Sequence, residues 1–199
     1  MLGSISPVGE ASRQQRWWVT ATAHVTASAV AGAATGAVLG AAGQALLAVA
    51  AVPVRARLAV LAGIVVVAAA SDAFAPGRLP TWHRQVDERW LTTYRGWVYG
   101  AGFGAQLGAG VTTIVTSAAT YAALAAAVLA GSWAAGLLIG AAFGVSRGVP
   151  LVLMAPVRTA DRLYAVTRLV AASEPRMRRL TIAGQSLLAV CAAVAATGA

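Results

Sequence analysis

Long apolar stretches separated by short polar segments dominate the pattern along the chain. Residues 17–53 contain no charged side chain, and neither do residues 97–145. As one helix the first stretch would be about 55 Å long, against a membrane hydrocarbon core of about 30 Å. We therefore expect each stretch to fold back on itself and to cross a membrane twice.

This pattern predicts an all-α fold, a polytopic membrane bundle of about six transmembrane helices. The predicted helices are about 17–33, 36–53 and 58–74, two between 97 and 154 divided at residues 131–133, and 180–196. Residues 1–16 form a polar N-terminal tail, and residues 17–199 form a single transmembrane domain. Within it, halves of about 17–75 and 97–197 are joined by a loop at 76–96, and a basic segment at 158–179 is expected to be a second loop.

The composition excludes most other classes of protein. Of the 199 residues, 59% are hydrophobic and 11% charged, against roughly 25% charged in an ordinary soluble domain. The net charge of +9 comes from 15 basic residues, all of them arginine. Because the arginines lie between apolar segments, they indicate orientation in a lipid bilayer and not nucleic-acid binding. A chain with arginine and no lysine is typical of a high-GC bacterial gene, so we expect the inner or plasma membrane of a bacterium.

The distribution of arginine predicts the orientation. The loops at 76–96 and 158–179 hold ten arginines, and the opposite side of the six-helix map holds four. Cytoplasmic loops carry the excess of positive charge, so both loops are expected in the cytoplasm and both termini outside.

Glycines recur at four-residue spacing in three segments, which places them on one face of each helix. Such glycines allow helices to pack closely within a membrane, and lining a path or permitting bending is the alternative. The residues are Gly32, Gly36 and Gly40; Gly100, Gly104 and Gly108; and Gly136, Gly140, Gly144 and Gly148.

A weak internal repeat divides the chain in two. GAVLG at 36–40 is followed by PVR at 53–55, and GAAFG at 140–144 is followed by PVR at 156–158. Three helices in each half would make the halves inverted relative to each other, an arrangement found in many transporters with a site at the repeat interface.

Two runs resemble the transmembrane domain of the DsbD/CcdA family of thiol–disulfide electron carriers. FGAQLGAGVTTIVTSAATYAALAAAVLAG at 103–131 is similar to the start of that family's second half, and GLLIGAAFGVSRGVPLVLMAP at 136–156 to its fifth helix. The resemblance covers most of residues 17–197 and implies six helices in two inverted halves. Exporters of sulfite or metals with a similar helix count are a second, weaker analogy.

The chain departs from this family in its cysteines. The family has a reactive cysteine in the first helix of each half, whereas the corresponding stretches here read HVTASAVAG at 24–32 and AGVTTIVTS at 109–117. Thiol–disulfide exchange needs a thiolate and a second sulfur, and Cys191 is the one cysteine present. We therefore expect a degenerate, cysteine-lacking relative without the redox function.

Polar side chains within apolar stretches are the candidates for a substrate path. They are His24, Gln106, Thr112, Thr113, Thr116, Ser117 and Arg147. Each has a structural alternative: hydrogen bonding inside the bundle for His24 and Gln106, bonding within their own helix for the hydroxyls, and snorkelling to the interface for Arg147. For Asp72, near a predicted helix end, capping is favoured over a role in transport.

No catalytic constellation is expected. His83, Asp87 and Glu88 lie in HRQVDER at 83–89, a solvated loop of opposed charges without a second ligand cluster, so we expect no enzyme activity, no metal and no cofactor.

The leading hypothesis is a permease-like protein that moves a small solute between two inverted halves. The alternative is an interaction or assembly subunit that packs against a membrane protein partner or a second copy of the chain. A redox enzyme ranks third. The identity of the solute and the coupling ion, the oligomeric state and the partner are not encoded in any motif of the sequence.

Overall fold

The structure is a computed structural model that describes residues 5–81, 89–110 and 115–198. In these residues every regular element is helical. Four helices are long and apolar enough to cross a membrane: Trp17–Val49, Val54–Phe74, Trp133–Met154 and Ala160–Thr197. The expected class, a helical membrane protein, agrees with this finding.

Helix α2 (Trp17–Val49) is continuous, so the predicted division near Gly32–Gly36 is wrong. Its glycines contact other helices and do not mark a turn, and the chain first turns at Ala51, whose φ is 49°. Helix α2 is about 50 Å long at 1.5 Å per residue, so it extends past the hydrocarbon core or tilts within it. Because α2 replaces the first two predicted helices, one of the six expected crossings is lost.

Helix α3 (Val54–Phe74) follows Pro53, whose fixed φ and missing N–H suit the position just before a helix. Helix α8 (Ala160–Thr197) has 38 residues and includes the basic segment that was predicted as a loop, so that prediction is wrong. The hydroxyl of Thr159 accepts the N–H of Arg162 (3.4 Å) and caps the start of α8, and Pro175 lies inside the helix.

The crossing predicted after residue 97 is interrupted. Helix α5 (Gly96–Ala109) ends at Gly110, which has a left-handed φ of 79°, and helix α6 (Ala119–Leu129) begins after residues 115–118, which are not helical. The expected division at 131–133 is confirmed, because helix α7 (Trp133–Gly148) begins there with Ser132 as its N-cap. A 3-10 helix, η1 (Val149–Met154), continues α7.

Two short helices complete the described elements. Helix α4 (Trp90–Thr93) precedes α5, and helix α1 (Pro7–Ser12) lies in the segment expected to be a polar tail. The side chain of Ile5 is 1% exposed and belongs to a buried cluster with Tyr99, Phe103 and Met154. The N-terminal segment therefore packs against the base of the bundle.

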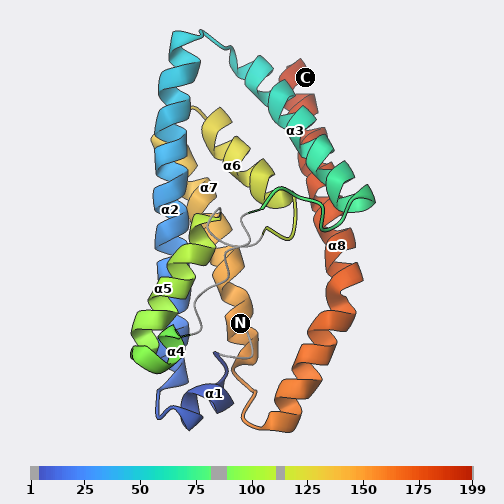
Figure 1. Cartoon of the computed structure of the whole chain (residues 1–199). Helices are drawn as coiled ribbons and strands as arrows, with labels where there is room; N and C mark the ends of the chain where they lie inside the picture. Colours follow the sequence, from blue (N-terminus) through green and yellow to red (C-terminus); the bar gives the residue numbers. More distant parts are fainter. Residues whose placement is uncertain (1–4, 82–88, 111–114, 199) are drawn as a thin grey trace.

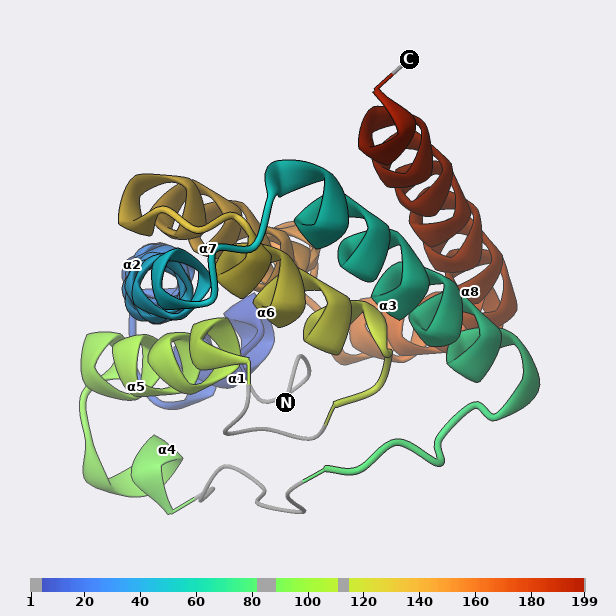
Figure 2. The same ribbon diagram turned by 90° about the horizontal axis from the view of Figure 1, so that it is seen from above.

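Helices α5 and α7 both pack against α2, α3 packs against α8, and α6 lies between these two groups (Figures 1 and 2). A second buried cluster, which includes Val65, Ala118, Ala122 and Ala189, joins α3, α6 and α8. Helix α1 lies at the same end as the start of α8, and the C-terminal end of α8 lies at the opposite end (Figure 1).

Candidate functional site

The glycines of α2 and α7 bring the two backbones into direct contact, which we call the α2–α7 seam. A Cβ atom built on Gly36 would meet the carbonyl oxygen of Gly136 and lie 2.8 Å from Cα of Gly140. A Cβ on Gly140 would lie 2.9 Å from Cα of Gly36. Ser28 donates a hydrogen bond from its hydroxyl to the carbonyl oxygen of Gly144 (2.7 Å) in the same seam. The neighbouring atoms are backbone, so any side chain at these positions would force the helices apart.

The glycines of α5 contact the other end of α2. A Cβ on Gly104 would meet the backbone of His24, and one on Gly108 that of Ser28. These contacts hold α5 beside the first half of α2, while Gly32, Gly36 and Gly40 serve the α2–α7 seam. Gly148 is looser, with its nearest neighbours at 3.2 Å.

A buried carboxylate ties the N-terminal segment to the bundle. Glu10 is fully buried and accepts hydrogen bonds from the hydroxyls of Thr20 (2.6 Å) and Tyr99 and from the guanidinium of Arg13 (2.7 Å). Burial opposes the charge on Arg13, but the hydrogen bonds to Glu10 and Tyr99 outweigh it and raise the pKa of its guanidinium above the ordinary value. The hydrogen-bond partners of the Glu10 carboxylate all come from the protein, and they attach α1 to α2 and α5.

Asp72, near the end of α3, is the centre of a second buried polar cluster. The N–H of Ala118 donates to its Oδ1 (2.8 Å), so Asp72 caps the start of α6, as expected from its position. The hydroxyl of Ser117 (2.7 Å) and the side-chain amide of Gln185 (3.0 Å) donate to its Oδ2. One carboxylate thus joins α3, α6 and α8.

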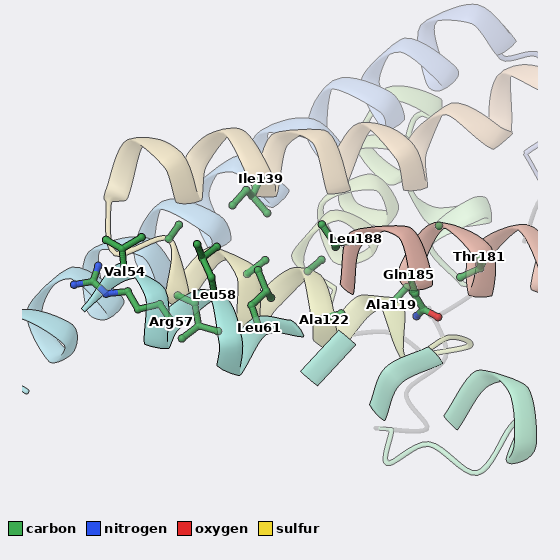
Figure 3. A pocket seen from close by; sticks show the side chains of 15 residues that line it. Val54, Arg57, Leu58, Leu61, Ala119, Ala122, Ile139, Thr181, Gln185 and Leu188 are labelled. Carbon is green, nitrogen blue, oxygen red and sulfur yellow. The ribbon is translucent and has the colours of Figure 1, made fainter. Parts of the chain in front are cut away.

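The larger of two cavities beside this cluster lies between α3, α6, α7 and α8 and has a volume of about 720 Å³. Its wall is mostly apolar: Leu58 and Leu61 reach into it from α3, Ile139 from α7 and Leu188 from α8 (Figure 3). Arg57 lies near one end of this large cavity and Gln185 near the other.

The smaller cavity, of about 260 Å³, lies on the other side of Asp72. Its wall includes charged and hydroxyl side chains and is less apolar than that of the large cavity, and Thr181 lines both cavities. The full lining of this small cavity is Asp72, Pro76, Gly77, Thr116, Ser117, Glu174, Met177, Arg178 and Thr181.

The structure separates the predicted path residues into two groups. Thr116 and Ser117 line the small cavity, while His24, Gln106 and Arg147 line neither cavity. Thr112 and Thr113, like His83, Asp87 and Glu88, lie outside the described residues.

His24, Gln106 and Arg147 lie at contacts between helices. His24 is 3% exposed in the contact with α5, and its Nδ1 has no hydrogen-bond partner in the described part of the chain. Arg147 is half-buried, donates to the hydroxyl of Thr120 (3.3 Å) and lies 5.4 Å from the ring centre of Phe143. Gln106 is half-buried on α5.

Sequence reasoning missed Glu10 and the pair Glu174 and Arg178. Ser6 and Pro7 were the available signal for α1, since Ser is a favoured N-cap and Pro a favoured first helical residue, and Ser6 does accept the N–H of Gly9 (3.2 Å). No local signal shows that Glu174 and Arg178 share a cavity with Asp72, because that follows from the packing of α3 on α8.

These features define a helical membrane protein with closely packed glycine helices and internal cavities. Residues 1–181 match a known family, which is described as the cytochrome c biogenesis protein transmembrane region. The chain belongs to this family, which confirms the resemblance to DsbD/CcdA-like transmembrane domains. No curated protein and no solved structure matches the chain.

Proposed function

We propose that the protein is a permease-like membrane protein that moves a small solute without thiol–disulfide chemistry. The observation that carries this proposal is the cavity of about 720 Å³ between α3, α6, α7 and α8. Its volume falls within the roughly 300–1,000 Å³ of ordinary small-molecule sites.

The interrupted crossing supports the proposal. Non-helical backbone at membrane depth is tolerated where protein covers it or where it lines a water-filled cavity. The break between α5 and α6 ends at Ser117 and Ala118, which bond to Asp72 beside the small cavity. Discontinuous helices of this kind form substrate sites in many transporters.

The packing of repeat-related segments also supports two inverted halves. GAVLG at 36–40 and GAAFG at 140–144 meet in the α2–α7 seam, with Gly32 near Gly144 and Gly40 near Gly136, so α2 and α7 run antiparallel. The helices that follow them, α3 and α8, also pack on each other. A pseudo-two-fold axis in the membrane plane produces this relation.

The composition excludes an internal disulfide step. Cys191 is the single cysteine of the chain, and it is exposed on α8. Exchange within one chain requires two sulfur atoms, so we infer that this chain carries out no internal thiol–disulfide exchange.

An osmotic swelling assay tests the proposal with two matched glycine variants. Neither Gly184, which lines the large cavity, nor Gly63, which does not, has any atom within 4 Å of a built Cβ. Gly184→Leu therefore fills the cavity without a backbone clash, and Gly63→Leu adds the same side chain elsewhere.

Proteoliposomes are exposed to small neutral, anionic, cationic and zwitterionic solutes, and swelling is followed by light scattering. We expect at least one solute to enter faster than into protein-free liposomes, and Gly184→Leu but not Gly63→Leu to slow it. Entry of every solute at the protein-free rate would contradict the proposal.

The assembly-subunit alternative rests on the first half of α8. There Tyr164 (67% exposed) and Leu169 (66% exposed) alternate with arginines and leave a face uncovered. If swelling is absent and the purified protein captures a second copy of the chain through this face, the alternative replaces the permease.

A further inference from the structure

The small cavity is lined by acidic and basic side chains. It lies where α3 ends, α6 begins and α8 passes, and Asp72, Glu174 and Arg178 contribute to its wall. Two carboxylates and one guanidinium therefore face a space of about 260 Å³.

Asp72 has no cationic partner among the described residues. It is 5% exposed, and its three hydrogen bonds come from neutral donors: a hydroxyl, a backbone N–H and a side-chain amide. In the part of the chain that the structure describes, Glu10 and Arg13 form the one ion pair within 4.0 Å.

Glu174 and Arg178 also have no ion-pair partner among the described residues. They lie one helical turn apart on α8, a spacing at which opposite charges commonly pair. Neither forms an ion pair or a side-chain hydrogen bond with a described residue. Arg178 is half-buried, and a partly desolvated guanidinium is stabilised by an anionic partner.

We propose that this small cavity binds a small zwitterion, with its cationic group against Asp72 and Glu174 and its anionic group on Arg178. A purely anionic solute would be repelled by the two carboxylates, and a simple cation would leave Arg178 without a group of opposite charge. A molecule that carries both charges places a group of opposite charge beside each of the three side chains. This inference rests on the proposed function, because it identifies the class of solute that enters the path.

The size of the cavity restricts the ligand further. Its volume lies just below the roughly 300–1,000 Å³ of sites for drug-sized molecules, so the ligand has the size of a simple amino acid. Asp72, in the wall of this space, accepts a hydrogen bond from Gln185, in the wall of the large cavity, and Thr181 lines both cavities. The two cavities are therefore neighbours.

Three probes of similar size test this inference: alanine as the zwitterion, ethylamine as the cation and propionate as the anion, all at pH 7. Binding of radiolabelled alanine to the full chain in lipid nanodiscs is measured by equilibrium dialysis, with the other two as competitors. We expect alanine to bind, and ethylamine and propionate to compete at least about tenfold more weakly.

Adjacent arginines provide the matched control. Arg178→Gln and Glu174→Gln should each weaken alanine binding by about fivefold or more, since each removes a charge-assisted contact. Arg179→Gln changes the next residue, which is exposed and does not line the cavity, and should leave binding unchanged.

Different results would contradict the zwitterion inference and the proposed permease function. If alanine does not bind, or if ethylamine competes as well as alanine and Arg178→Gln has no effect, the zwitterion inference is wrong. The proposed function is decided separately by the swelling rates of the Gly184→Leu and Gly63→Leu proteins. The comparison of the three probes on the unmodified protein needs no variant to fold.

Discussion

A single methyl group added to the α2–α7 seam should separate two helices. In Gly140→Ala the new Cβ would meet the carbonyl oxygen of Gly32 and lie 2.9 Å from both the Gly32 carbonyl carbon and Cα of Gly36. Non-bonded carbons prefer about 3.5–4.0 Å, and backbone atoms on a facing helix cannot rotate away. Inserting a methylene-sized group into a packed interior costs about 1–3 kcal/mol.

Gly63→Ala is the control, because a Cβ there meets nothing within 4 Å. Both substitutions gain the higher helix propensity of alanine, about 1 kcal/mol, so the difference between the variants isolates the clash. Equilibrium unfolding in mixed micelles with increasing SDS, followed by tryptophan fluorescence, gives the two free energies of unfolding. We expect Gly140→Ala to be less stable than Gly63→Ala by about 1–3 kcal/mol. Equal stabilities within about 0.5 kcal/mol would refute the close backbone contact.

Three further predictions concern other parts of the chain. Asp72→Asn should lower the free energy of unfolding by about 1–3 kcal/mol in the same assay, because the amide places a donor against donors; an exposed carboxylate changed in the same way, Asp161→Asn, should have a smaller effect. Cys191→Ala should leave solute entry unchanged in the swelling assay, and complete loss of entry by a folded protein would restore a redox role. Reporter fusions should place a site after Arg84 in the cytoplasm and the C-terminus outside; a cytoplasmic C-terminus would contradict the arginine bias.

The hydrophobic pattern was sufficient for the class of fold and for the ends of several helices. It placed the helix now seen as α3 within four residues and the turn before α7 correctly, because Pro53 cannot continue a helix and Gly131 adopts a left-handed φ of 59°. The same pattern gave a wrong division of α2, because the glycines at 32 and 36 were interpreted as a turn. Within a membrane, small residues are also the residues that let helices touch, and only the facing residues on α7 distinguish the two uses.

The prediction of a loop in the basic segment at 158–179 was also wrong. Arginine, leucine and alanine favour helix wherever they occur, so a polar stretch can continue a transmembrane helix beyond the lipid. For the site, Thr116 and Ser117 stood out as hydroxyl side chains within an apolar stretch, and both line the small cavity. Arg178 was seen as orientation charge, and its place in a cavity depends on contacts between α3 and α8 that no local pattern encodes.

The accessibility of single cysteines to water tests the central claim, that a solute path runs through the large cavity between α3, α6, α7 and α8. In a Cys191→Ala background, a cysteine is introduced at Gly184 in the cavity wall or at Gly63 outside it, and intact proteoliposomes are treated with a membrane-impermeant thiol reagent. Such reagents attack the thiolate, which forms in water and not in lipid. The account predicts that the Gly184→Cys protein reacts and then loses solute entry, while the Gly63→Cys protein does neither. A Gly184→Cys thiol as unreactive as the Gly63→Cys thiol would show a dry cavity and contradict the account.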